Sequence, residues 1–144
     1  KKADELDDID QALAELDIQE ASSKKSTEQA STRPAPRAHC TLTYTGSWEN
    51  GFLLFGGEHF DGQRVRVYGD LFRLCISPES ECIWTKISSK TSPRPRSSHQ
   101  AVLIKGGLYI FGGEFTSANE NNFNHFNDLW RFDVKSLQWS NLTS

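Results

Sequence analysis

The chain has 144 residues, of which 36% are hydrophobic and 24% charged, and it carries a net charge of -3 at pH 7. These values are ordinary for a soluble protein of about one domain, and no apolar run approaches the ~20 residues that a membrane-spanning helix needs. The first 32 residues contain four lysines and nine acids, which leaves twelve basic and ten acidic residues for the rest. Neither balance supports nucleic-acid binding, which needs clustered basic residues.

The N-terminal part divides into two segments. Residues 1–20 carry an aliphatic stripe at helical spacing among many acids, which predicts a short acidic amphipathic helix; the stripe is Leu6, Ile9, Leu13 and Leu16. Such a helix could bind a partner, or it could fray in isolation or pack loosely on its own protein. Residues 21–35 are rich in Ser, Thr, Lys and Gln and would bury almost nothing, so we predict a disordered linker.

From Pro36 onward, short apolar runs alternate with turn residues, which is typical of β-strands. We predict two sets of four strands, at 39–44, 52–55, 70–76 and 82–87, and at 99–104, 108–111, 128–134 and 138–142. Polar loops are expected at 59–69 and, as a longer loop after Gly112 and Gly113, through residue 126. The two sets form two small antiparallel sheets, one in each of the segments 36–94 and 95–144.

The two segments repeat the same markers in the same order. An apolar run followed by Gly-Gly-Glu occurs at 52–58 and again at 108–114, and each copy has Pro-Arg and a histidine before it and Asp-Leu-aromatic and a tryptophan after it. The markers are Arg37, His39, Gly56, Gly57, Glu58, Asp70 and Trp84, and then Arg96, His99, Gly112, Gly113, Glu114, Asp128 and Trp139. Matching positions lie 59 (37 to 96), 56 (56 to 112), 58 (70 to 128) and 55 (84 to 139) residues apart. A stable period with varying loop lengths indicates a tandem repeat.

The repeated residue types have packing roles. A double glycine at a strand end permits positive φ and close approach of neighbouring backbones. Each tryptophan offers a large apolar area that can wedge between adjacent sheets. We therefore interpret the repeated Phe-Gly-Gly stretch as architectural.

These residues resemble the kelch motif, over about three quarters of the chain. The resemblance implies an all-β fold, a kelch-type β-propeller fragment of two four-stranded antiparallel blades, preceded by the short acidic helix and the linker. The chain begins with lysine and contains no methionine, so we expect it to be a piece of a longer product. Because each sheet has two apolar faces, two isolated blades are expected to aggregate or to stay partly molten.

The resemblance also implies a scaffold that binds other proteins through loops on one propeller face. Here these are the loops 59–69, 115–126 and 88–95. Arginines beside aromatic residues on a rigid scaffold have the composition of a hot spot for an acidic or polar peptide. The candidate partner-binding residues are Arg64, Arg66, Tyr68, Lys90, Arg94, Phe123 and His125. The alternative is that they are ordinary solvated loop residues.

Other chemistry receives less support from the sequence. Glu58 and Glu114 occupy equivalent places and could hold a cation, but a buried glutamate accepting backbone hydrogen bonds is the favoured interpretation. No nucleophile-base set, phosphate loop or cofactor motif is present, so we predict no enzyme, no cofactor and no small-molecule substrate. The runner-up function is a propeller enzyme completed by further blades, and a ubiquitin-ligase adaptor ranks third.

Three cysteines, Cys40, Cys75 and Cys82, show no metal-type spacing. Cys75 and Cys82 flank a hairpin turn and could face each other, but reduced thiols are favoured. The absence of a signal peptide predicts a cytoplasmic location by default, with the nucleus left open.

Overall fold

The structure is a computed structural model that describes residues 26–47 and 51–143. The helix predicted for residues 1–20 lies outside these residues. All the regular elements within the described residues are β-strands, which confirms the predicted all-β class. No helix in these residues is long and apolar enough to span a membrane.

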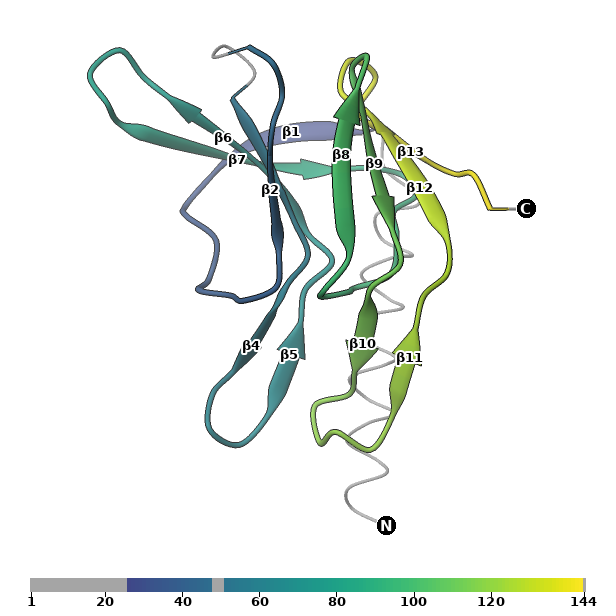
Figure 1. The fold of residues 1–144 in the computed structure, drawn as a ribbon. Coiled ribbons are helices and arrows are strands. Elements are labelled where there is room, and N and C mark those ends of the chain that lie inside the picture. Colours follow the sequence, from purple (N-terminus) through teal and green to yellow (C-terminus); the bar gives the residue numbers. More distant parts are fainter. Residues whose placement is uncertain (1–25, 48–50, 144) are drawn as a thin grey trace.

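The two largest sheets are antiparallel, and we call them blade 1 and blade 2 (Figure 1). Blade 1 contains β2 (Thr41–Tyr44), β3 (Phe52–Phe55), β6 (Leu71–Ile76) and β7 (Cys82–Ser88). Blade 2 contains β8 (Gln100–Ile104), β9 (Gly107–Phe111), β12 (Leu129–Asp133) and β13 (Gln138–Asn141). In both blades the strands lie in chain order across the sheet, and all eight coincide with the predicted strands to within about two residues at each end.

The predicted linker is wrong for residues 27–31, because these residues form a fifth strand of blade 1. Strand β1 (Thr27–Ser31) pairs antiparallel with the outer edge of β7, with Glu28 opposite Ile87. The Glu28 carboxylate accepts hydrogen bonds from Arg73 at 2.6 Å and from the Thr85 hydroxyl at 2.7 Å. A polar sequence thus becomes a strand because the exposed edge of β7 supplies backbone partners.

The prediction of two long polar loops is wrong, because each of these segments contains a two-stranded hairpin. Strands β4 (Glu58–Phe60) and β5 (Val65–Val67) pair in the first, and β10 (Glu114–Thr116) and β11 (Phe123–His125) in the second. Both hairpins extend beyond the same end of the blades and lie side by side (Figure 1). A backbone hydrogen bond of 3.2 Å from Val65 to Ala118 joins them.

The two blades pack face to face. Because side chains alternate along a strand, each sheet has two faces. We call the face that carries Phe55 in blade 1, and its equivalent Phe111 in blade 2, the front face. The opposite face, which carries Leu54 in blade 1 and Ile110 in blade 2, is the back face. The front face of blade 1 packs on the back face of blade 2.

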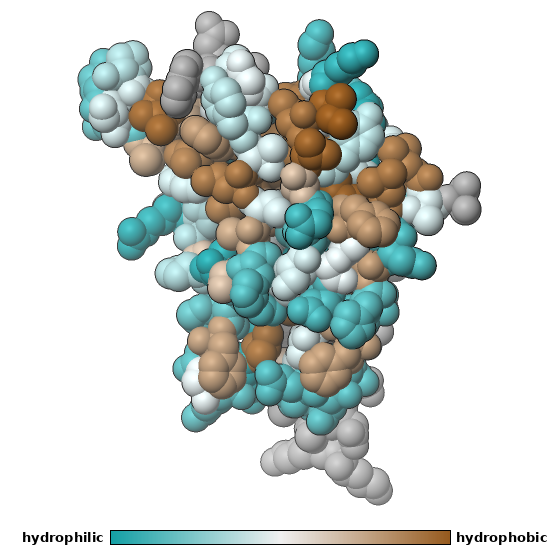
Figure 2. Space-filling view, in the orientation of Figure 1, coloured by the Kyte–Doolittle hydropathy of each residue, from teal (hydrophilic) through white to brown (hydrophobic). Residues whose placement is uncertain are grey.

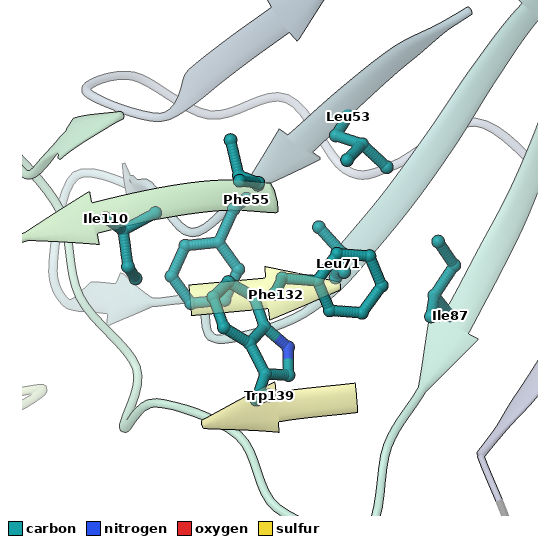
Figure 3. Packing of buried hydrophobic residues seen from close by; sticks show 8 residues of the cluster. Leu53, Phe55, Leu71, Ile87, Ile110, Phe132 and Trp139 are labelled. Carbon is teal, nitrogen blue, oxygen red and sulfur yellow. The ribbon is translucent and has the colours of Figure 1, made fainter. Parts of the chain in front are cut away.

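This joint holds the hydrophobic core (Figure 3). Its buried members come from both blades: Leu53, Phe55, Leu71 and Ile87 from blade 1, and Leu108, Ile110, Phe132 and Trp139 from blade 2. The Trp139 ring lies 5.2 Å from that of Phe55 and 5.1 Å from that of Phe132. Trp139 therefore wedges between the sheets, as its position in the repeat predicts, whereas Trp84 stands half-buried on the opposite side of blade 1.

Strand register corrects the alignment of the repeats. The isolated bridges Ala38 to Glu58 and Ser97 to Glu114 are equivalent, so residues before the first strand are offset by 59 throughout. On this alignment His99 corresponds to Cys40, and His39 corresponds to Ser98. His39 and Ser98 also share a positive φ of 54° and 57°. The two histidines treated as one marker therefore occupy different structural positions.

His99 lies buried in the joint. Its Nε2 is 2.8 Å from the Thr41 hydroxyl of blade 1, its ring packs edge-on against Phe55, and its Nδ1 has no hydrogen-bond partner among the described residues. Burial, with a smaller contribution from the positive charge of Arg96, lowers the pKa of His99 to about 4. The joint therefore requires a neutral imidazole.

Replacing Phe132 with alanine tests the core. Phe132 is fully buried, so Phe132→Ala removes contacts from both sheets, and we expect it to lower the free energy of unfolding by about 3–5 kcal/mol. The matched change Phe123→Ala removes a ring that is 64% exposed, so the loss should stay below about 1 kcal/mol. Urea denaturation measures both, and equal losses would contradict the proposed core.

His99 makes stability depend on pH. Its folded-state pKa is below the unfolded value of 6.5, so the unfolded chain binds more protons between these values. The free energy of unfolding should be at its full value above about pH 6.5 and should fall by about 2–3 kcal/mol as the pH drops towards 4. In His99→Gln this dependence should be absent, and urea unfolding of both proteins at several pH values measures the difference. Parallel curves for the two proteins would refute this role.

Candidate protein-binding site

The double glycines direct the chain from each blade into its hairpin. Gly56 and Gly57 have φ values of +65° and +100°, a region that residues with a Cβ rarely adopt. A Cβ on Gly56 would lie 2.4 Å from the Arg96 carbonyl oxygen, and one on Gly57 would lie 2.7 Å from the Cβ of Cys40. Glycine is therefore required where blade 1, its hairpin and blade 2 meet.

A buried arginine braces the base of each hairpin. In blade 2, Arg96 donates to the Gly112 carbonyl at 2.9 Å and to both carboxylate oxygens of Asp128 at 2.6 and 3.0 Å. Its guanidinium also stacks over the ring of Phe126 at 4.0 Å. Partial burial opposes ionisation of Asp128, but hydrogen bonds from Arg96 and from Trp130 outweigh it, and the pKa of Asp128 is lowered.

Arg37 repeats this arrangement in blade 1. Its guanidinium donates to the Gly56 carbonyl at 3.1 Å, pairs with Asp70 and stacks 3.8 Å over the ring of Tyr68. The paired guanidinium and carboxylate fix the strand end from which β4 begins. The markers Arg37, Asp70, Arg96 and Asp128 are thus structural.

Glu58 joins the two blades. Its carboxylate accepts hydrogen bonds from the Ser97 hydroxyl at 2.9 Å and from His39 Nδ1 at 2.8 Å. Both partners are side chains, so the predicted backbone hydrogen bonds to this carboxylate are not found among the described residues. Because the Ser97 hydroxyl donates to a carboxylate and not to an imidazole, these three residues do not have the arrangement of a nucleophile and its base.

The cysteine pair is not brought together. Cys75 lies opposite Ile83, whereas Cys82 lies opposite Ile76, so the two thiols point to opposite faces of the β6–β7 hairpin. Among the described residues, no group of three or more His, Cys, Asp or Glu could hold a metal ion.

The turn of the first hairpin is held by its own aspartate. Asp61 Oδ1 accepts hydrogen bonds from the backbone N–H groups of Gln63 and Arg64, both at 2.8 Å. The N–H groups of Arg64 and Gln63 lower the pKa of Asp61. This carboxylate is therefore engaged within the turn, which fixes the direction of β5.

The asparagine-rich turn of the second hairpin is also ordered. The Ser117 hydroxyl accepts a hydrogen bond from the Asn122 N–H at 3.0 Å and donates to Asn119 at 3.1 Å. The Ser117 N–H in turn donates to the Asn122 carbonyl at 3.0 Å. The asparagines therefore serve turn geometry, because their short side chains satisfy nearby backbone groups.

The exposed side chains of the two hairpins are cationic and aromatic, and we call them together the hairpin surface. Within the first hairpin, Phe60 lies opposite Val65 and Arg66 opposite His59, so Phe60 and Arg66 point to opposite faces. Figure 2 shows isolated brown areas among mostly teal atoms at this end of the molecule. Its exposed members are Phe60, Arg64, Arg66, Phe123 and His125. Neither Arg64 nor Arg66 forms an ion pair with a described residue, and Arg66 lies 5.3 Å over the Tyr68 ring.

The structure places four of the predicted partner-binding residues on this surface: Arg64, Arg66, Phe123 and His125. His125 also lies opposite Glu114, with 3.4 Å between Nε2 and a carboxylate oxygen. Tyr68 lies at the base of the first hairpin, half-buried under Arg37. The Tyr68 ring packs against the guanidinium of Arg37, and the guanidinium of Arg66 lies over the same ring.

The other two predicted residues lie in the segment between the blades. Lys90 is exposed between Ser89 and Thr91, whose hydroxyls donate to carbonyls of Leu137 and Trp139. This segment is held beside β13, so Lys90 is not brought onto the hairpin surface. Arg94 is exposed next to Pro95, which packs against Gly69 below the first hairpin.

Sequence reasoning missed Phe60 as a surface residue. Phe60 ends β4 and is exposed beside the turn at Asp61. The sequence signal for Phe60 is a large apolar residue within a polar segment that no blade strand buries. Interpreting 59–69 as a loop concealed that a strand carries it.

A family model described as the KLHDC2/KLHL20/DRC7 Kelch-repeats domain matches residues 2–144. Among curated proteins, an F-box/kelch-repeat protein of Arabidopsis thaliana is 33% identical over 116 residues, which cover 76% of this chain and 22% of that protein. Kelch domain-containing protein 3 of Bos taurus is 42% identical over 50 residues, or 35% of this chain and 12% of that protein.

A third relative is tip elongation aberrant protein 3 of Schizosaccharomyces pombe, 33% identical over 67 residues, which cover 46% of this chain and 5% of that protein. The chain therefore matches at most about a quarter of the length of these three relatives. The family match, the paired repeat markers and the two antiparallel blades agree, and the chain belongs to the kelch-repeat family.

Proposed function

We propose that this protein is a protein-interaction scaffold and that its hairpin surface binds an acidic segment of a partner protein. Family membership supports the first half, because kelch repeats generally serve in protein–protein interaction. The second half rests on one observation: two hairpins joined to each other carry exposed arginines that have no carboxylate partner among the described residues, together with exposed phenylalanines.

The charges of this end favour an acidic ligand. Arg64 and Arg66 project from the first hairpin, whereas the Asp61 carboxylate is engaged within its own turn. Glu58 is likewise occupied by Ser97 and His39. Glu120 in the turn of the second hairpin is also exposed, but Arg64 and Arg66 outnumber it. A partner carboxylate can pair with a guanidinium through two hydrogen bonds.

The aromatic residues favour a ligand that also carries an apolar side chain. Phe60 and Phe123 stand exposed on neighbouring hairpins, one on β4 and one on β11. Aromatic and arginine side chains dominate protein-binding hot spots because they bury large areas with few rotatable bonds. An acidic segment with an interspersed apolar residue fits both features.

The rigidity of the hairpins favours binding energetically. Both turns are closed by side-chain hydrogen bonds, both hairpin bases are braced by an arginine and an aspartate, and Val65 is bonded to Ala118. A surface that is already ordered loses less conformational entropy on association. Small changes in the exposed side chains should therefore change affinity without changing the fold.

Charge reversal at the two arginines tests the proposal. Peptides selected from a random display library on the wild-type chain should be rich in Asp and Glu, with an aromatic or aliphatic residue among them. For the selected peptides, Arg64→Glu combined with Arg66→Glu should weaken binding by about 10- to 1000-fold, because each arginine contributes about 1–2 kcal/mol. Fluorescence polarisation at low and high salt measures this, and binding should weaken as salt rises.

The matched control is Lys105→Glu combined with Lys135→Glu, which makes the same charge change in the exposed β8–β9 and β12–β13 turns at the opposite end of blade 2. This control should bind the peptides with little change. Selected peptides without acidic residues, or equal losses in the two double variants, would contradict the proposal. Partners captured from cells with wild type and with the arginine variant should differ in the same way.

A further inference from the structure

Strand β1 belongs to blade 1 by its backbone pairing but not by its composition. All of its residues pair with the outer edge of β7, yet only Ser31 is partly covered and the others are exposed. Its one apolar side chain is that of Ala30, and no β1 residue lies in the hydrophobic core of the described residues. The strand is therefore held mainly by its backbone.

One side chain of β1 makes a specific contact with the blade. The Glu28 carboxylate accepts hydrogen bonds from Arg73 Nε at 2.6 Å and from the Thr85 hydroxyl at 2.7 Å. Arg73 is only 7% exposed, and a hydrogen bond between a guanidinium and a carboxylate is stronger than one between neutral groups. Ala30 lies opposite Thr85 and points to the same face as Glu28, so its small size leaves room for the carboxylate.

Blade 2 shows that a blade does not need a carboxylate from outside at this place. Strand register puts Arg131 in blade 2 at the position that Arg73 has in blade 1. Arg131 pairs at 2.9 Å with Asp133, two residues further along the same strand. The blade 1 equivalent of Asp133 is Cys75, so β6 has no acid there. The carboxylate that meets Arg73 comes instead from Glu28, on a separate strand.

A strand of another protein can make the same contacts as β1. An extended segment that adds to a sheet edge gains main-chain hydrogen bonds, and contacts of its alternate side chains give specificity. Such a segment restores the backbone hydrogen bonds that β1 gives up, so the exchange changes little in backbone pairing. The side chains then decide which strand occupies the edge, and β1 contributes little more than one carboxylate.

We propose that the outer edge of β7 is a docking site for an extended segment of a partner protein, and that β1 is this chain's own occupant, which the partner displaces. The site recognises a glutamate through Arg73 and Thr85, together with a small residue two positions further on. It is distinct from the hairpin surface, because it lies along the edge of blade 1, whereas the hairpins extend beyond the end of the blades (Figure 1).

Hydrogen exchange tests whether β1 can leave the edge, and it needs no substitution. In the wild-type chain, the β1 amides that face β7 should exchange at least about 100-fold faster than the amides of β3 and β9, because β1 can open without disturbing the core. Exchange as slow in β1 as in β3 would refute the proposal, because β1 would then leave only when the whole chain unfolds.

A variant with a vacated edge tests what the site recognises. Glu28→Ala combined with Gln29→Pro, the opened variant, removes the carboxylate and interrupts the backbone pairing at two exposed residues. Peptides selected on it from a random display library should share a glutamate followed two positions later by Ala, Ser or Gly. In fluorescence polarisation they should bind at least about 10-fold more weakly to wild type, where the tethered β1 competes. Adding Thr85→Val to the opened variant should weaken binding by about 3- to 10-fold.

Two controls locate the binding. Thr32→Ala combined with Arg33→Pro makes similar changes just beyond β1, and this variant should bind the selected peptides like wild type. Arg64→Glu combined with Arg66→Glu in the opened variant should leave their affinity unchanged, because these arginines belong to the hairpin surface. Peptides without the glutamate pattern, equal affinity for wild type and the opened variant, or a loss of binding on reversing the hairpin charges would contradict the proposal.

The oligomeric state separates a partner protein from a second copy of this chain as the occupant. In sedimentation velocity experiments the wild-type chain should show no dimer that depends on β1. A wild-type dimer that the opened variant does not form would show that two copies exchange β1, and it would overturn the assignment of the site to a partner protein.

Discussion

Burial of one sheet face against another is the constraint on which the rest of this structure depends. A four-stranded blade has apolar side chains on both faces, so it cannot be stable as a separate layer in water. In this chain Phe55 and Trp139 meet in the single joint between the described blades, and most of the buried hydrophobic residues lie there. Among the described residues, no second sheet packs on the other face of either blade.

Polar contacts give this joint its direction and its register. Glu58 of the first hairpin bonds to Ser97, and Thr41 of β2 bonds to His99, so blade 1 and its hairpin are joined to the residues that lead into blade 2. These contacts need Gly56, because the Arg96 carbonyl approaches it too closely for a Cβ. The repeat markers thus specify how blades are spaced, while the apolar side chains supply the free energy.

The candidate binding surface depends on this architecture but is not part of it. Arginine and aspartate pairs brace the strand ends from which the hairpins emerge, so the hairpins are held in place although they bury little. Exposed residues such as Arg64 and Phe123 are then free to differ from one blade to the next without cost to the core. Loops held on a rigid scaffold are a general means by which one fold carries different binding specificities.

The sequence by itself determined the all-β class, the family and the eight blade strands, because apolar periodicity and the positions of glycine act locally along the chain. Only the tertiary structure decided the rest. The polar segment at Thr27 to Ser31 becomes a strand because β7 offers an open edge, and the hairpins form because Gly57 and Gly113 turn the strands out of the blades. That Cys40, and not His39, is the blade 1 equivalent of His99 likewise depends on backbone pairing, which no pattern of residue types encodes.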